Sequence, residues 1–234
     1  MPIHTEQTGK EIHTILFDLD GTILNSGPGV MRCMKMTLEH FGIPEPPEDR
    51  LRLCVGPPLS ESFGKLYGLP EEKIQEAVNF FRAEYNARGI FECDLYPGIR
   101  ECLMDLSEQG YLLVITSSKV EKACRRITDH FGITDCFFDI AGSIPEENLE
   151  KKVDVINAFF RRHPEQKRED CVLVGDTHFD AEGAAAAGVG FVCVTYGYED
   201  PAVLARIQAI AKPGSAAEIR RLFLSGSSIM GSER

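Results

Sequence analysis

The sequence has no basic run, and its acidic residues outnumber its basic ones. It contains 36 aspartates and glutamates against 25 lysines and arginines, which gives a formal net charge of −11. Proteins that bind nucleic acid or anionic membranes usually present a basic surface to the phosphates. We therefore expect neither nucleic acid nor a membrane among the partners. A small phosphate ester is still compatible, because a bound metal ion would set the charge of its own site.

The sequence also lacks long hydrophobic runs and paired cysteine motifs. No apolar stretch approaches the roughly 18 residues of a membrane-spanning helix, and no early segment joins a basic region to an apolar run. None of the eight cysteines falls in C-x-x-C or a comparable zinc-binding spacing. Most occupy apolar positions of periodic segments, as Cys102, Cys124, Cys171 and Cys193 do. Such thiols are expected in a core and a reducing compartment, so we predict a cytoplasmic protein.

The chain is long enough for a sizeable core. Of its 234 residues 43% are hydrophobic, which suits one large domain or one domain with an insertion. Between about residues 25 and 95, apolar residues recur at helical spacing with no strand pattern between them. From Tyr96 onward, strand-like and helical segments alternate. That alternation is typical of a parallel sheet with right-handed crossovers.

We therefore predict an α/β fold, with a doubly wound, Rossmann-like parallel sheet and an inserted all-helical cap domain. The predicted boundaries are residues 1–24 for the start of the core, 25–95 for the cap and 96–234 for the rest of the core. The first strand joins the sheet across the insertion. The other strands are expected at residues 112–116, 137–141, 172–175 and 191–195.

The segment I-L-F-D-L-D-G-T-I at residues 15–23 is the most informative of the chain. Side chains alternate along a strand, so Asp18 and Asp20 leave the backbone on the same side, and Gly21 permits a sharp turn. Two carboxylates this close do not both ionise readily unless a cation lies between them. Either a metal binds there, or one of the two keeps its proton. A plain turn has the same pattern, so this segment alone leaves both interpretations open.

A second acidic cluster lies far downstream, in the segment C-V-L-V-G-D-T-H-F-D at residues 171–180. Asp176 follows an apolar strand and a glycine, and Asp180 comes four residues later. Ligands of parallel sheets bind outside the carboxyl ends of the strands, so both clusters converge on one crevice. Three or four carboxylates there require a hard divalent cation. Mg²⁺ fits best, because it takes oxygen ligands and keeps waters and a substrate phosphate in its shell.

Two further segments offer groups that bind phosphate. The strand Y-L-L-V-I-T-S-S-K ends in the hydroxyls of Thr116, Ser117 and Ser118. These can donate to phosphate oxygens, although they fit a helix cap equally well. Lys151 and Lys152 precede a helical stretch and either would supply positive charge, although most surface lysines are simply solvated.

Together these segments resemble the haloacid dehalogenase-like superfamily of phosphotransferases. The resemblance rests on D-x-D-G-T at 18–22, the strand ending at Thr116, a lysine at Lys152 and G-D-x-x-x-D at 175–180, in matching order within residues 12–224. V-G-P-P-L-S-E-S-F at 55–63 and Y-G-Y-E at 196–199 resemble a narrower branch. That branch contains phosphoglycolate phosphatases, pyrophosphatases of the same type and 5′-nucleotidase-like hydrolases.

The resemblance implies a Mg²⁺-dependent phosphatase that hydrolyses a small phosphorylated metabolite through an aspartyl-phosphate. Asp18 would be the nucleophile, and Asp20 the general acid and then the general base. Mg²⁺ would be held by the Asp18 side chain, the Asp20 main-chain carbonyl and Asp176. Asp180 would order the surroundings of the metal from behind.

The resemblance also assigns the remaining positions. Thr116, Ser117 and Lys152 would hold the phosphoryl oxygens. Relatives often have proline after this lysine, whereas the sequence here is E-K-K-V, so Lys151 stays an alternative to Lys152. The segment T-S-S-K is one residue longer than the usual pattern, which leaves a substrate contact of Lys119 open.

The cap is expected to select the leaving group, with Arg32, Leu59 and Ser60 facing the site. Phosphoglycolate, short sugar phosphates, nucleoside monophosphates and pyrophosphate all remain candidate substrates. A 5′-nucleotidase or pyrophosphatase is the alternative, and a phosphomutase would keep every motif. A dehalogenase would lack the second acid at Asp20, and a receiver-type signalling module would be about half as long, without the helical insertion. A monomer or homodimer is expected.

Overall fold

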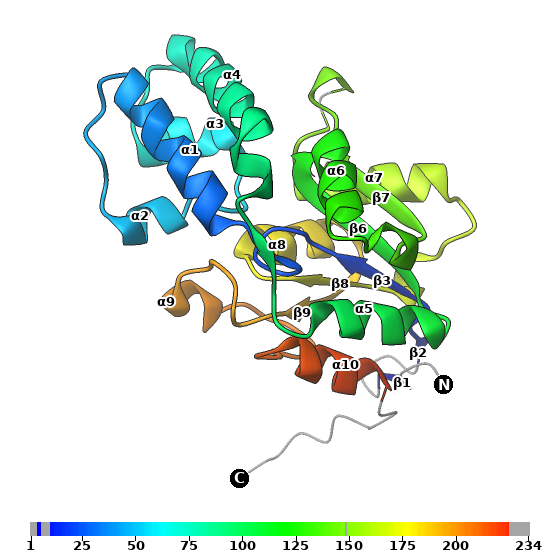
Figure 1. The fold of residues 1–234 in the computed structure, drawn as a ribbon. Coiled ribbons are helices and arrows are strands. Elements are labelled where there is room, and N and C mark those ends of the chain that lie inside the picture. Colours follow the sequence, from blue (N-terminus) through cyan, green and yellow to red (C-terminus); the bar gives the residue numbers. More distant parts are fainter. Residues whose placement is uncertain (1–3, 6–9, 148, 225–234) are drawn as a thin grey trace.

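A five-stranded parallel sheet forms the centre of the molecule, in a computed structural model that describes residues 4–5, 10–147 and 149–224 (Figure 1). The strand order is β7-β6-β3-β8-β9, and every neighbouring pair is parallel. The strands are β3 (Thr14–Phe17), β6 (Leu112–Val120), β7 (Asp139–Ser143), β8 (Cys171–Gly175) and β9 (Gly190–Cys193). The predicted parallel sheet is confirmed.

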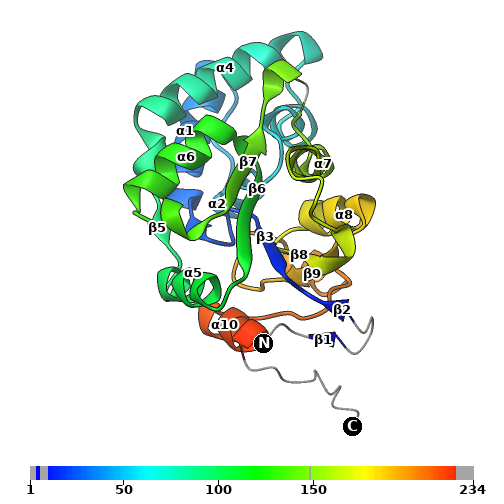
Figure 2. The ribbon, with the colours of Figure 1, turned by 90° about the vertical axis from the view of Figure 1, so that its right-hand side faces the viewer.

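The central strands are apolar because helices cover both faces of the sheet. All residues of β3 and β8 are buried. One face is covered by α5 (Ile99–Glu108) and α6 (Glu121–His130), with α10 (Ala216–Leu224) against α5 (Figure 2). The other face is covered by α7 (Lys152–Arg162) and α8 (His178–Ala187). The doubly wound arrangement is therefore confirmed.

The segment between β3 and α5 forms a helical region, consisting of α1 to α4 and two shorter turns. Its elements are α1 (Gly27–His40), α2 (Glu48–Arg52), α3 (Leu59–Glu61), the π-turn η1 (Ser62–Leu66), α4 (Glu71–Ala87) and the 3₁₀ turn η2 (Gly89–Phe91). These helices stand to one side of the sheet, beyond the ends of its strands (Figure 1). Apolar residues at helical spacing predicted α1, α3 with η1, and α4. They did not predict η2 or the short α2, which directly follows a proline-rich stretch.

A two-stranded antiparallel ribbon joins the helical region to the core. It pairs β4 (Leu24–Asn25) with β5 (Asp94–Leu95), one strand in each linker. The sequence gives no sign of this ribbon, because two residues are too few to show alternation. The remaining elements are β1 (His4–Thr5), β2 (Lys10–Glu11), η3 (Thr134–Cys136), η4 (Pro145–Glu147), η5 (Arg168–Asp170) and α9 (Pro201–Leu204).

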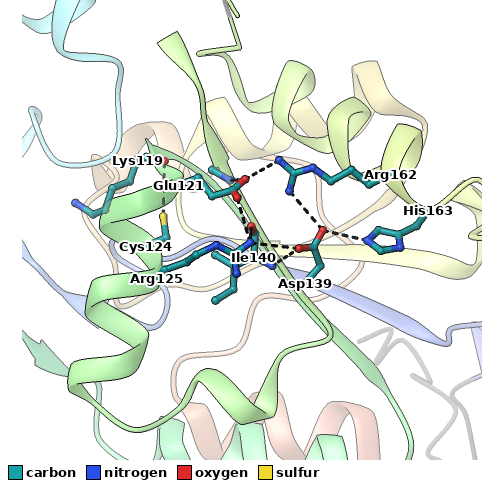
Figure 3. Close-up of polar contacts among 9 residues, drawn as sticks. Lys119, Glu121, Cys124, Arg125, Asp139, Ile140, Arg162 and His163 are labelled. Carbon is teal, nitrogen blue, oxygen red and sulfur yellow. Dashed lines mark hydrogen bonds and ion pairs between the residues drawn. The ribbon is translucent and has the colours of Figure 1, made fainter. Parts of the chain in front are cut away.

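A network of ion pairs ties α6, β7 and α7 together at the surface (Figure 3). Glu121 accepts from Arg162 at 2.6 Å, and the Asp139 carboxylate faces Arg162 at 3.5 Å and His163 at 3.1 Å. Single exposed ion pairs contribute little, but these share partners across three elements. The network therefore fixes α6 relative to α7, and α7 begins with a residue of the site described below.

The cysteines of the sheet and its helices lie in the core as expected. Cys102, Cys124, Cys171 and Cys193 are buried, and all eight cysteines are free thiols. Within the described residues, no helix has both the length and the apolar character needed to span a bilayer.

Candidate active site

The carboxyl ends of three central strands bring the predicted polar residues together. Phe17 lies between Ile115 of β6 and Val174 of β8. The next residue, Asp18, therefore emerges beside the strand ends that carry the downstream motifs. All the side chains predicted to act in catalysis, metal binding or phosphate binding are buried. They are Asp18, Asp20, Thr116, Ser117, Lys152, Asp176 and Asp180.

Lys152 is the cation at the centre of this cluster. Its Nζ lies 2.6 Å from Asp18 Oδ1 and 2.8 Å from Asp180 Oδ1, and donates to the Thr116 carbonyl at 2.8 Å. Burial alone would lower the pKa of Lys152, but the two carboxylates outweigh burial and raise it, so the lysine stays charged. Lys151 is exposed, one residue before α7 begins. The structure therefore places Lys152, and not Lys151, at the site.

The packing of α8 against α7 explains why Lys152 reaches so far inward. A Cβ atom on Gly183 of α8 would lie 2.5 Å from Lys152 Cγ. Only glycine leaves room there for the lysine stem. Gly183 of α8 thus gives Lys152 its path to Asp18.

Three carboxylates lie close enough to share one cation. Oxygens of Asp18, Asp176 and Asp180 all lie within 4.8 Å of one another. Burial raises the pKa of Asp18 to about 6, and Asp180 and Asp20 add to the rise while Lys152 opposes it. Burial and the charges of Asp180 and Asp18 likewise raise the pKa of Asp176 well above its usual value.

One carboxylate oxygen of this group, on Asp176, has no hydrogen-bond partner among the described residues. Asp176 Oδ2 accepts from the Tyr198 backbone N–H at 2.8 Å, whereas the buried Asp176 Oδ1 has no hydrogen-bond partner among the described residues. One lysine does not neutralise three buried carboxylates. A hard divalent cation would bind the free oxygen and favour the ionised forms of Asp18 and Asp176. These residues therefore fit a metal site.

The Asp180 carboxylate accepts hydrogen bonds from the turn that carries Asp176. Its Oδ2 accepts from the backbone N–H groups of Asp176 and Thr177 at 3.2 and 3.0 Å, and from the Thr177 hydroxyl at 2.8 Å. The bond from the Thr177 backbone N–H belongs to the capping box of α8. Because Oδ1 faces Lys152, this one side chain holds both the Asp176 turn and the lysine in place.

Two glycines make room for Asp176 itself. Cβ atoms on Gly21 and Gly197 would lie 2.1 and 2.2 Å from Asp176 Oδ2, and Gly21 has a φ of +84°. Neither position accepts a side chain without displacing the carboxylate. The sequence motif predicted the turn at Gly21. Gly197 became significant only in three dimensions, although it belongs to the Y-G-Y-E segment.

Asp20 lies in a second polar cluster that joins the core to the helical region. Its Oδ2 lies 3.0 Å from Lys119 Nζ, and its buried Oδ1 has no partner among the described residues. Lys119 Nζ also donates to the Tyr85 hydroxyl at 2.9 Å and lies 4.5 Å from the centre of the Tyr85 ring. Tyr85 is on α4. In the sequence it appeared only as one residue of an apolar stripe.

The hydroxyl side chains of Thr116, Ser117 and Ser118 lie within strand β6 and not in a loop beyond it. Thr116 Oγ1 is buried and lacks a partner among the described residues. Ser117 Oγ accepts from the Lys119 backbone N–H at 3.3 Å. The backbone carbonyl of the same residue, Thr116, accepts from Lys152. Phosphate binding by these hydroxyls stays a prediction.

A cavity of about 470 Å³ lies between the core and the helical region. Asp20 and Lys119 line it from the core, and Leu59, Ser60 and Tyr85 line it from the helical region. Arg32 is not among the lining residues. Its guanidinium pairs with Glu92 at 2.6 Å, which holds it elsewhere. Of the three predicted cap residues, the structure therefore brings Leu59 and Ser60 to the cavity and leaves Arg32 outside it.

Comparison with known proteins identifies the family to which the chain belongs. Residues 15–194 match the model of the haloacid dehalogenase-like hydrolase family. The chain belongs to this family. The resemblance seen in the sequence is thereby confirmed, and the receiver-type signalling module is ruled out.

Individual relatives of this hydrolase differ in what their names describe. Tyrosine-protein kinase PtkA of Mycobacterium tuberculosis is 39% identical over 191 residues, 81% of this chain and 64% of PtkA. The chain thus spans less than two thirds of PtkA's length. A 5′-nucleotidase of Pseudomonas aeruginosa is 34% identical over 184 residues, 79% of this chain and 83% of that one. Other relatives are named pyrophosphatase PpaX and phosphoglycolate phosphatase.

Solved structures show the same fold. A haloacid dehalogenase-like hydrolase, SP0104 from Streptococcus pneumoniae, has a TM-score of 0.82 and 34% identity, over 89% of this chain and 96% of that one. The similarity therefore includes the helical region as well as the core.

Proposed function

We propose that this hydrolase is a Mg²⁺-dependent phosphatase that cleaves a small phosphate monoester through an aspartyl-phosphate on Asp18. The observation that carries the proposal is the buried Asp18 carboxylate 2.6 Å from Lys152, which also donates to the Thr116 backbone carbonyl. A phosphoglycolate phosphatase-like activity is favoured by the sequence resemblance. The names of relatives support a 5′-nucleotidase or pyrophosphatase as the alternative.

The chain's own residues account for both steps of the reaction. Asp18 attacks phosphorus, the bond to the ester oxygen breaks, and the leaving oxygen takes a proton from the Asp20 carboxyl. Asp20 then accepts a proton from the attacking water, the bond between phosphorus and Asp18 breaks, and inorganic phosphate leaves. Lys152 and Thr116 hold phosphoryl oxygens and keep the group in line with Asp18.

The contact with Lys119 determines how Asp20 can act. Lys119 holds Asp20 Oδ2, so the unpartnered Oδ1 is the oxygen available to the leaving group and to water. Asp18, Asp176 and the main-chain carbonyl of Asp20 would hold Mg²⁺. When bound, the ion neutralises phosphoryl charge.

Residues 25–95 are proposed to act as a cap that closes over this site. The cavity between the helical region and the core supports this, and so does the contact of Tyr85 with Lys119. A cap of this kind excludes water and meets the leaving group, while the core holds the phosphoryl group.

We expect chelation to abolish hydrolysis of 4-nitrophenyl phosphate and Mg²⁺ to restore it. The buried carboxylates need a hard cation before they can receive a phosphate dianion. Turnover is measured after exhaustive EDTA treatment and again after Mg²⁺ is added in excess. A parallel thermal melt checks that the chelated protein stays folded. Full activity of the chelated enzyme would contradict the metal assignment and favour dehalogenase-type chemistry.

Replacing Leu59 or Ser60 by alanine is expected to change substrate preference far more than the rate on a small activated phosphate. These side chains line the part of the cavity that a leaving group would fill, and apolar contacts there discriminate by roughly tenfold or more. We would compare kcat/KM for phosphoglycolate, a nucleoside monophosphate and 4-nitrophenyl phosphate. Arg32→Gln, outside the cavity, is the control. Equal losses on all three substrates would give α3 a structural role only.

A further inference from the structure

Three cations without acidic partners line the cavity, one from the helical region and two from the core. Arg82 on α4, and Lys122 and Arg126 on α6, all line the cavity. Within the described part of the chain, none of the three forms an ion pair. Arg126 makes only a long hydrogen bond to the Asn86 carbonyl, at 3.4 Å, and lies over the Phe91 ring. Arg82 is half-buried, and Lys122 and Arg126 are exposed. Other exposed cations, Lys65 and Lys73 of the helical region, both pair with glutamates.

The acids of the same cavity do not neutralise these cations. Asp20 is paired with Lys119. Glu146 and Glu150 line the cavity from the segment after β7, but neither makes an ion pair with Arg82, Lys122 or Arg126. The whole chain has a net charge of −11, whereas three unpaired cations line this cavity. Such a lining attracts an anion.

Apolar side chains line the same cavity. Val78, Phe81 and Tyr85 of α4 and Leu59 line the cavity on one side, and Val120 and Ala123 on the other. A volume of about 470 Å³ lies within the roughly 300–1,000 Å³ of sites that enclose drug-sized ligands. A two-carbon leaving group would leave much of this apolar space unfilled.

We propose that Arg82, Lys122 and Arg126 form a second anion subsite, and that the substrate is an extended phosphate monoester. Its leaving group is apolar along its length and carries a carboxylate or phosphate at the end away from the ester. Planar guanidinium groups suit both anions, because each offers two parallel donors. The inference rests on the proposed phosphatase function and narrows its substrate class.

The test compares probes that differ only in their distal charge. We would measure kcat/KM for 4-(2-carboxyethyl)phenyl phosphate, its uncharged carboxamide and the matching 2-phosphonoethyl compound. Wild type is expected to prefer at least one anionic probe over the amide by at least about tenfold, since charge-assisted hydrogen bonds are the stronger ones. Whether the carboxylate or the phosphonate is preferred identifies the anion.

Three substitutions assign the subsite to its residues. Arg82→Gln, Lys122→Gln and Arg126→Gln should each reduce the ratio of anionic to amide probe, and the ratio within one variant cancels any general loss of activity. Arg88→Gln is the matched control, because Arg88 is exposed just beyond α4 and does not line the cavity. It should keep both the wild-type ratio and the activity. A preference retained in all three subsite variants would overturn the assignment.

Two further outcomes separate this inference from the proposed function. Hydrolysis of 4-nitrophenyl phosphate with no preference between charged and uncharged probes would refute the subsite alone. Absence of hydrolysis on every ester would refute the phosphatase proposal. In that case calorimetric binding of 3-phenylpropanoate and its amide still tests the subsite. Equal affinity for the two would refute it.

Discussion

Asn in place of Asp18 is expected to eliminate turnover of every phosphate ester, with a loss of at least about a thousandfold. An amide is no nucleophile toward phosphorus. The substitution also removes a carboxylate from Lys152, whose Nζ lies 2.6 Å from Asp18 Oδ1, and from the group that would hold the metal. The measurement is kcat on 4-nitrophenyl phosphate with saturating Mg²⁺.

The control for this variant is Asp135→Asn, an exposed aspartate at η3, outside the cavity and the carboxylate group. It should retain wild-type activity. A thermal melt of Asp18→Asn checks that the protein stays folded. Turnover above about one per cent of wild type in that variant would exclude Asp18 as a covalent nucleophile, because losing a nucleophile costs several orders of magnitude.

Asp20→Asn is expected to accumulate the phosphoenzyme. With an activated leaving group, attack by Asp18 needs little help from an acid, whereas attack by water needs the base. Asparagine keeps the shape of the side chain beside Lys119 but cannot accept the proton. Intact-protein and peptide mass spectrometry should show one added phosphoryl group on the peptide that contains Asp18.

The double variant Asp18→Asn, Asp20→Asn should carry no label, since it lacks the Asp18 carboxylate that would receive the phosphoryl group. Label on Thr116 or Ser117 in either variant would show that the roles are misassigned. Wild type, quenched during turnover, should show far less label than Asp20→Asn, because its second step is fast.

The positions of the strand-end acids could be predicted because they depend on local rules. A buried strand followed by acids predicts where Asp18 and Asp176 emerge, and parallel pairing predicts that they meet. The sequence could not choose between Lys151 and Lys152. That choice depends on where α7 begins and on Gly183, which lets the lysine pass α8.

The contacts between the helical region and the core could not be predicted in the same way. Tyr85 follows the period of the apolar residues on α4, and only the tertiary structure shows its hydroxyl meeting Lys119. Arg32 shows the opposite error, because the sequence could not reveal that Glu92, 60 residues away, holds its guanidinium. Contacts of this kind depend on the relative placement of packed elements, which periodicity does not report.

The ribbon of β4 and β5 has a consequence for how such an enzyme diversifies. The chain leaves the core at Asn25 and returns at Asp94, and these two residues are directly paired. Paired residues of antiparallel strands have Cα atoms only about 4.5–5.5 Å apart, so the excursion closes on itself like a hairpin whose loop is a whole folded unit. Insertions, deletions or replacement of that unit leave the strand order and the register of the sheet unchanged. A change within this unit would therefore alter the proposed preference for the leaving group without moving the residues at the strand ends.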